Sequence, residues 1–207
     1  MEGWKEEELE RMGAQWVKGE CRKEGWEQWG LRGQGLVPVK VREAAVVVVG
    51  TGAVGRAVGM GVGQLGVGEV WLVDPDTVEG HNVGSQGWSQ EDVGRKKVDV
   101  LGEEIAERWG PLVGTIPERW SWKIAREMRD KGREWVVMLG VDSFEARRGV
   151  MRDVVRWGRG KVVVVEGRVL GDVGEVRRVE TGNEGQVKRW GETVEGEGEE
   201  VVARHRV

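Results

Sequence analysis

Hydrophobic residues along the chain gather in short apolar runs, and the stretches between the runs carry apolar residues at helical spacing. The runs are rich in valine and lack the polar alternation of a half-exposed strand, which is typical of strands buried on both faces of a sheet. They predict strands at residues 45–49, 69–73, 112–116, 134–139 and 161–165. The intervening stretches predict helices at residues 53–65, 92–109, 120–129 and 144–157. This alternation predicts an α/β fold with a doubly wound, mostly parallel sheet.

The two ends of the chain depart from this alternation. In residues 1–30, apolar residues recur at helical spacing but glycines interrupt them, which predicts two short helices. Residues 173–181 predict an antiparallel strand, and residues 191–200 are acidic, rich in glycine and poor in apolar residues, as in a solvated, mobile tail. We therefore divide the chain into an N-terminal helical extension (residues 1–35), a central domain (36–190) and an acidic flexible tail (191–207).

Composition narrows the class of protein. With 207 residues, of which 39% are hydrophobic and 33% charged, the chain is typical of a globular protein with one core. It has no run of about 18 apolar residues, and its acidic start lacks the apolar segment of a secretory signal, so we expect a cytoplasmic protein without a membrane partner. A net charge of −4 argues against a dedicated nucleic-acid-binding protein. The single cysteine, Cys21, rules out an intrachain disulfide and a zinc site built from cysteines.

A glycine-rich sequence, GTGAVG at residues 50–55, directly follows the first predicted strand and begins the first predicted helix. In a phosphate-binding turn of this type, Gly50 permits the tight turn, Gly52 lets the backbone approach a phosphate, and Gly55 lets the helix pack on the sheet. The helix N-terminus adds N–H donors and partial positive charge. Asp74, at the end of the next strand, is placed to accept hydrogen bonds from a ribose. These features predict a nucleotide site, although the 35 glycines of the chain leave open a tight turn without a ligand.

A polar segment follows Asp74, and we expect it to be a loop at the carboxyl ends of the strands, where ligands bind in such sheets. Lys97 lies beyond this loop in the first turns of the next predicted helix, where it can neutralise phosphate charge. Up to Asp74 the pattern fits an NAD-dependent oxidoreductase equally well. The polar segment does not fit that class, and the chain offers neither a tyrosine nor a well-placed histidine as a catalytic acid–base.

The residues of this segment have a recognisable order. They are Asp74, Asp76, Val78, Glu79, Asn82, Gln86, Gly94 and Lys97. Their spacing resembles the ThiF/MoeB/HesA family of ubiquitin-activating-like adenylyltransferases, in which D-x-D-x-V-E-x-x-N-x-x-x-Q is followed by a helix that begins V-G-x-x-K. The sequence Gln-Gly-Trp at residues 86–88 is similar to that of stand-alone bacterial ThiF-like proteins. Further on, Asp142 and Ser143, followed by two arginines, resemble the family's next conserved step, so the resemblance covers about residues 36–180.

The resemblance implies a Rossmann-like domain that binds ATP with Mg²⁺. Such an enzyme attaches AMP to the C-terminal carboxylate of a ubiquitin-like or sulfur-carrier protein, or of a peptide, and releases pyrophosphate. Carried over by position, the three glycines would cradle the nucleotide, Asp74 and Asp76 would lie in its site with Asp74 on the ribose, and Asn82, Gln86 and Lys97 would contact the phosphates. Asp142 would bind magnesium or orient the attacking carboxylate. The family also implies a homodimer, in which Arg32 is the best candidate for an arginine that reaches the partner subunit's site.

Two departures from the family pattern matter for activity. The family often has an arginine directly before the glutamine, whereas this chain has Ser85, so one cation at the phosphates is missing. No cysteine follows Asp142, so a thioester step on this chain is not expected and the reaction would stop at the acyl-adenylate. Two alternatives therefore stay open beside the adenylyltransferase. One is an NAD(P)-dependent oxidoreductase, and the other is a ThiF-like pseudoenzyme that acts as a binding scaffold.

Overall fold

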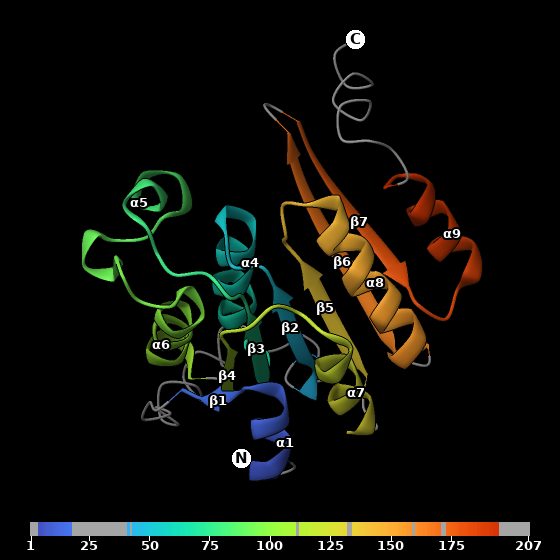
Figure 1. The fold of residues 1–207 in the computed structure, drawn as a ribbon, viewed down its shortest axis with the longest axis horizontal. Coiled ribbons are helices and arrows are strands. Elements are labelled where there is room, and N and C mark those ends of the chain that lie inside the picture. The colour runs from blue at the N-terminus through green and yellow to red at the C-terminus, as the bar shows by residue number, and fades with distance from the viewer. Residues whose placement is uncertain are drawn as a thin grey trace.

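The computed structural model describes residues 4–17, 41, 43–110, 112–131, 134–158, 160–170 and 173–194. Within these residues, seven strands form one sheet with the order β1-β4-β3-β2-β5-β6-β7, and helices cover it on both sides (Figure 1). The parallel strands are β2 (Ala45–Val49), β3 (Glu69–Val73), β4 (Leu112–Ile116), β5 (Trp135–Leu139) and β6 (Val162–Leu170). Two antiparallel strands, β1 (Gln15–Trp16) and β7 (Val173–Glu180), complete the edges. The predicted α/β class with a mostly parallel sheet is confirmed.

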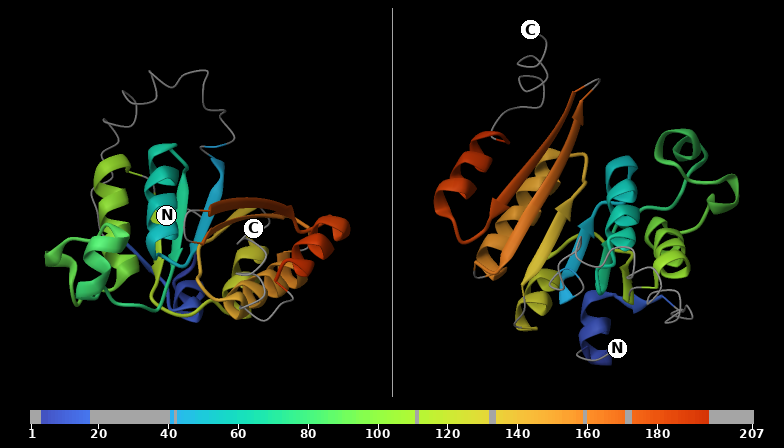
Figure 2. Two further views of the ribbon diagram at one scale, coloured as in Figure 1. Left: turned by 90° about the horizontal axis from the view of Figure 1, so that it is seen from above. Right: turned by 180° about the vertical axis from the view of Figure 1, so that it is seen from behind.

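The helices form two layers, which the view from above shows on either side of the sheet (Figure 2). Their bounds are α1 (Glu6–Met12), α4 (Ala53–Gln64), α5 (Gly80–Gln86), α6 (Lys97–Trp109), α7 (Trp122–Asp130), α8 (Phe144–Gly158) and α9 (Glu184–Glu192). The sheet buries side chains on both faces, as β2 illustrates. Val46 and Val48 pack in the core under α4 and α6, whereas Val47 and Val49 pack in the core under α1, α7, α8 and α9. Burial of both faces explains why the strand sequences are continuous apolar runs.

The segment between β3 and α6 is more structured than the sequence predicts. Residues 80–86 form helix α5 instead of a loop, and a short 3₁₀ turn follows at Gln90–Asp92. Helix α6 begins at Lys97 and not at residue 92, because the backbone of Gly94 and Arg95 exchanges hydrogen bonds with Val78. This pairing fixes the start of α6 against the end of β3, and with it the position of Lys97.

The ends of the chain also differ from the predictions. The N-terminal extension contains helix α1, but residues 15–16 then form strand β1 and add it to β4, which the helical prediction missed. At the other end, α9 continues to Glu192 and Val194 is only 1% exposed, so the packed part of the chain passes the predicted boundary at residue 190. Cys21 and Arg32, in the N-terminal extension, lie outside the described residues, and so do residues 195–207 of the predicted tail. Among the described helices, none has the length and apolar character that crossing a membrane requires.

Candidate nucleotide site

The candidate site lies where three neighbouring strands end at the same level. Val49 at the end of β2 pairs with Val73 of β3 on one side and with Leu139 of β5 on the other. Gly50, Asp74 and Gly140 therefore leave the sheet side by side. From β2 the strand order runs to β3 and β4 in one direction, whereas β5 and β6 continue the sheet in the opposite direction. In open α/β sheets, ligands bind at the carboxyl ends of the strands where the strand order reverses in this way.

The glycine loop at this edge has no room for side chains where it must be tight, and it is open where a ligand would approach. Gly50 has φ +85°, a conformation that favours glycine, and a Cβ atom there would lie 2.9 Å from the backbone nitrogen of Val141. A Cβ atom on Gly55 would lie 1.7 Å from the carbonyl oxygen of Gly50. Gly52, the N-cap of α4, faces open space instead. The first N–H groups of α4, which have no partner within the helix, lie beside this open space, whereas the contacts at Gly50 and Gly55 leave no room for a side chain.

Asp74 holds the glycine loop to the end of β3. Its side chain is buried, and Oδ2 accepts hydrogen bonds from the backbone nitrogen of Thr51 (2.6 Å) and from Thr51 Oγ1 (3.0 Å). Its second oxygen, Oδ1, accepts a hydrogen bond from the backbone nitrogen of Asp76 at 2.9 Å. Three of the four or so acceptor positions of the carboxylate therefore serve the protein itself. The sequence suggested a ribose contact for Asp74 and did not reveal this role in ordering the loop.

Asp76 and Lys97 form an ion pair beside the loop. Lys97 Nζ lies 3.2 Å from Asp76 Oδ2, and the backbone nitrogen of Lys97 donates to the Asp76 carbonyl. The Lys97 side chain is only 7% exposed, whereas that of Asp76 is 61% exposed. Burial of its side chain and the contact with Asp76 fix the ammonium group of Lys97, and the exposed carboxylate of Asp76 offers a hydrogen-bond acceptor to a ligand. The structure thus brings together two residues that the sequence separates by a helix and a turn.

Asn82 and Gln86 lie on α5, and both turn their side-chain oxygens inward. Asn82 is buried, and its Oδ1 accepts a hydrogen bond from the backbone nitrogen of Glu79 (2.9 Å) at the start of the helix. Gln86 Oε1 accepts a hydrogen bond from Trp88 Nε1 at 3.1 Å. Among the described residues, no hydrogen bond uses the amide nitrogens of either side chain. Both residues therefore retain N–H donors, the groups that a phosphate accepts from.

Ser85, which replaces the arginine of the family pattern, is exposed. Its hydroxyl donates to the carbonyl oxygen of His81 at 3.1 Å, within the same helix. A cation does lie close to the turn that follows α5: Nη1 of Arg56, on α4, would lie 3.3 Å from a Cβ atom on Gly87. Arg56 is already paired with Glu104 (2.6 Å) and stacks over Trp88. The sequence gave Trp88 only as part of Gln-Gly-Trp, without a role, and it did not single out Arg56.

Asp142 lies at the end of β5, on the other side of the glycine loop from Asp74. Its side chain is exposed, and the carboxylate makes no hydrogen bond or ion pair with any described residue. The next residue, Ser143, accepts a hydrogen bond from the backbone nitrogen of Ala146 through Oγ and so caps α8. No group of three or more acidic, histidine or cysteine side chains in the described parts of the chain could hold a metal ion. A single carboxylate still fits Mg²⁺, which often takes one or two carboxylates together with substrate phosphates.

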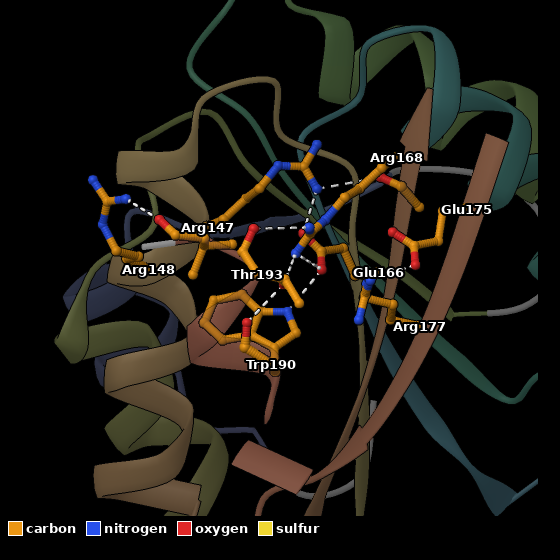
Figure 3. A network of polar contacts seen from close by, with 10 residues as sticks. Arg147, Arg148, Glu166, Arg168, Glu175, Arg177, Trp190 and Thr193 are labelled. Atoms are coloured by element: carbon orange, nitrogen blue, oxygen red, sulfur yellow. Dashed lines mark hydrogen bonds and ion pairs between the residues drawn. The ribbon is translucent and has the colours of Figure 1, made fainter. Parts of the chain in front are cut away.

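The two arginines that follow Asp142 contact other groups and not Asp142 itself: Arg147 belongs to a buried network, whereas Arg148 is exposed. Figure 3 shows Arg147 and Arg168 converging on Glu166, which is fully buried on β6 (Nη1–Oε1 2.5 Å and Nη2–Oε2 2.7 Å). Trp190 of α9 also donates to Glu166, at 2.7 Å. Burial raises the pKa of Glu166, but the hydrogen bonds from Arg168, Arg147 and Trp190 outweigh burial and hold that pKa below its usual value. Arg148 donates instead to the carbonyl oxygen of Val194 (2.6 Å), so the network ties α9 to α8 and β6.

The fold and this edge of the sheet define a Rossmann-like nucleotide-binding protein. The model of the ThiF family matches residues 21–200, and the chain belongs to that family. A curated relative, the adenylyltransferase and sulfurtransferase UBA4 of Eremothecium gossypii, is 31% identical over 187 residues, which cover 88% of this chain and 38% of the relative. The adenylyltransferase and sulfurtransferase uba4 of Emericella nidulans is 40% identical over 81 residues, or 39% of this chain and 16% of the relative.

Solved structures of similar fold come from Escherichia coli. The complex of MccB with MccA-N7isoASN is 26% identical, with a TM-score of 0.56, and the match covers 69% of this chain and 41% of that one. The tRNA N6-threonylcarbamoyladenosine dehydratase TcdA in complex with ATP is 21% identical, with a TM-score of 0.60 over 76% of this chain and 64% of that one, which shows the shared fold. This chain thus spans less than half the length of the two curated relatives and of MccB.

Proposed function

We propose that the protein activates a C-terminal carboxylate by adenylylation. ATP supplies the AMP group, the acceptor is a ubiquitin-like or sulfur-carrier protein or a peptide, and pyrophosphate is released. One observation carries this proposal. A glycine loop at a helix N-terminus is flanked at the same edge of the sheet by a fixed ammonium, Lys97, and by the carboxylate of Asp142, which has no hydrogen-bond or ion-pair partner among the described residues. An anion-binding turn with a cation on one side and an acid on the other suits the transfer of a nucleotidyl group between two anions.

Each step of the reaction has a residue that supports it. The acceptor carboxylate attacks the α-phosphorus of ATP, a new C–O–P bond forms, and the bond from that phosphorus to the β-phosphate oxygen breaks, so that the electron pair leaves with pyrophosphate. The acceptor is already ionised at neutral pH, so no general base is needed. The N–H groups of α4, the amides of Asn82 and Gln86, and the Lys97 ammonium stabilise phosphate charge, while the exposed Asp76 carboxylate is available to ribose hydroxyls. Asp142 would hold a magnesium ion together with the bound nucleotide, and the ion would supply further charge neutralisation.

The names of the relatives support the choice of acceptor. The curated relatives are adenylyltransferases and sulfurtransferases, and MccB was solved with forms of MccA and with ATP. We infer from these names a protein or peptide C-terminus as acceptor. We also propose a homodimer in which Arg32 reaches the partner's site, on the family resemblance alone, and a cytoplasmic location, on the sequence features described above. Residues 143–207 contain no cysteine, so the proposal ends at the acyl-adenylate and includes no thioester step within these residues.

Pyrophosphate exchange tests the proposal directly. The protein is incubated with ATP, magnesium and labelled pyrophosphate, together with small ubiquitin-like carrier proteins that end either in a free carboxylate or in an amide. We expect label to enter ATP only with the free carboxylate. Asp142→Ala is expected to abolish exchange while leaving the fold intact, because the Asp142 side chain makes no contact that the described residues need. Unchanged exchange by Asp142→Ala would remove Asp142 from the site.

A scaffold function has one observation in its favour. The exposed Ser85 leaves the position without the cation that the family pattern provides. A pseudoenzyme would bind ATP yet show no exchange with any carrier protein. In that case Ser85→Arg offers a second measurement, since restoring the charge would restore exchange in an enzyme that lacks only this group.

A further inference from the structure

Trp88 lies directly after the turn that ends α5, and its indole contacts the side chain of Gln86. The ring is only 3% exposed and packs in the core with Val78 and Val98. Its Nε1 lies 3.1 Å from Gln86 Oε1. Gly87 between them has φ +78°, a left-handed conformation that brings the two side chains back toward each other. The short sequence Gln-Gly-Trp thus contains a hydrogen bond between a buried indole ring and a half-buried amide.

The chemistry of the two groups fixes which way the amide points. An indole nitrogen can only donate a hydrogen bond, so it must face the oxygen of the carboxamide. The NH₂ group of Gln86 is then turned away from Trp88. A phosphate oxygen can only accept hydrogen bonds, so this orientation, and not the flipped one, is attractive to ATP. A flipped amide would present an oxygen to the phosphate and repel it.

The ring itself is held by a charged pair on two other helices. Arg56 lies in the first turn of α4, and its guanidinium stacks over the Trp88 ring with 4.9 Å to the centroid. Glu104 of α6 accepts a hydrogen bond from Arg56 Nη2 at 2.6 Å and also from Arg108. The contact of Arg56 with Trp88 and Gly87 places the end of α5 beside the first turn of α4, whose N-terminus receives the phosphates in the proposed function.

We propose that Trp88 is a positioning residue, which locks the Gln86 amide with its N–H donors toward the phosphates of ATP, and that Arg56 and Glu104 hold its ring for this purpose. The proposal rests on the proposed function in one respect, namely that ATP is the ligand. It gives a role to three residues, on α4, on α6 and after α5, for which the sequence had suggested none.

A double-mutant cycle with Trp88→Phe and Gln86→Ala tests the proposal by calorimetric titration with Mg-ATP. Phenylalanine keeps an aromatic ring under Arg56 but lacks the N–H, so we expect Trp88→Phe to weaken ATP binding about five- to tenfold. In the Gln86→Ala background the same change is expected to have no effect on affinity, because Trp88 acts only through Gln86. Gln86→Glu is expected to weaken ATP binding more than Gln86→Ala, since Oε1 can still accept from the indole while the other oxygen meets the phosphate.

Trp135→Phe is the matched control. It also removes an indole N–H from a buried ring, there bonded to the Met128 carbonyl, but it lies at the start of β5 and away from the loop. We expect it to lower the midpoint of thermal unfolding and to leave ATP affinity unchanged.

Wild-type affinity in Trp88→Phe, or an equal loss with and without Gln86, would overturn the positioning role alone. Failure of the wild-type protein to bind ATP would overturn the proposed function and this role together. The chemical shift of the Trp88 indole N–H reports the hydrogen bond between Trp88 and Gln86 independently of ATP. Gln86→Ala is expected to move this shift upfield whether or not ATP binds, so a missing hydrogen bond is distinguished from a missing nucleotide site.

Discussion

Asp74 illustrates how a residue that sequence motifs assign to a ligand also serves the fold. Its oxygens accept hydrogen bonds from the backbone nitrogen and hydroxyl of Thr51 and from the backbone nitrogen of Asp76. These donors lie in the two turns that form the site. The neighbouring Asp76, by contrast, keeps its carboxylate largely exposed. The motif D-x-D therefore combines one acid that shapes the glycine loop with one that is free to meet a nucleotide. The spacing predicts that both lie at the site, but only the hydrogen bonds separate their tasks.

Asp74→Asn tests the structural task. An asparagine can present only one oxygen, so either Thr51 or Asp76 loses its acceptor and a backbone N–H faces an NH₂ group. We expect the free energy of unfolding to fall by about 1 to 3 kcal/mol, as for a buried donor left without a partner. Urea denaturation of the wild-type protein and the variant measures this difference. Asp92→Asn, at an exposed turn capped by Ser89, is the control with a much smaller expected effect. Equal stability of Asp74→Asn and wild type would show that the loop does not depend on these bonds.

Among the elements, α4 gives the clearest contrast between glycines that packing requires and glycines that it does not. Gly59 and Gly63 face α6, where added Cβ atoms would lie 3.1 Å from Leu101 and 2.8 Å from Ile105. Gly61, on the same helix, faces open space. Gly55 packs in the same tight manner on the glycine loop, against the carbonyl oxygen of Gly50, so three glycines of this helix lie where a side chain has no room.

Alanine substitutions in α4 should therefore act in opposite directions. Gly61→Ala is expected to raise the free energy of unfolding by about 0.5 to 1 kcal/mol, because alanine favours a helix interior over glycine. Gly63→Ala gains the same propensity but pushes against Ile105 and Trp109, and we expect a net loss of about 1 to 3 kcal/mol. Denaturant unfolding of both variants checks the prediction. Stabilisation by Gly63→Ala would mean that α4 and α6 can move apart at no cost.

Prediction from sequence succeeded for the elements with strong apolar patterns and failed where local polar contacts decide. The bounds of β2, β3 and β4 were predicted without error, because continuous valine-rich runs have few alternatives in a buried sheet. Helix α5 was missed because its sequence, GHNVGSQ, is polar and contains glycines, and its stability depends on the capping contacts of Glu79 and Asn82. The positions of Asp74, Asp142 and Lys97 at one edge followed from topology, whereas the contacts of Arg56, Trp88 and Glu166 required the folded structure.

At the scale of the whole molecule, the buried Glu166 joins β6, α8 and α9. At neutral pH, Glu166→Gln leaves the guanidinium groups of Arg147 and Arg168 without their carboxylate, and we expect a loss of about 3 to 5 kcal/mol in the free energy of unfolding. Because the pKa of Glu166 is lower in the folded than in the unfolded protein, its contribution is fully present above the unfolded value of about 4.3 and is lost as pH falls through the folded pKa.

Chemical denaturation between pH 7 and pH 3 measures this dependence. The difference in stability between wild type and Glu166→Gln is expected to be constant from pH 7 to about pH 5 and to shrink below about pH 4. Glu103→Gln, which breaks an exposed pair with Arg95, serves as the control with a small difference at neutral pH. A wild-type advantage that persists undiminished at pH 3 would contradict the low pKa of Glu166.

The central claim is that the edge of the sheet at Gly50 binds ATP through phosphate contacts that include Lys97. Calorimetric titration of the wild-type protein and of Lys97→Ala with Mg-ATP, AMP, NAD⁺ and NADH tests it most directly, with Lys97→Met as a variant that keeps the buried apolar stem. We predict saturable Mg-ATP binding that both variants weaken about ten- to hundredfold, a much smaller effect on AMP, and no binding of NAD⁺ or NADH. Binding of NAD⁺ or NADH without binding of ATP would contradict the account and favour an oxidoreductase.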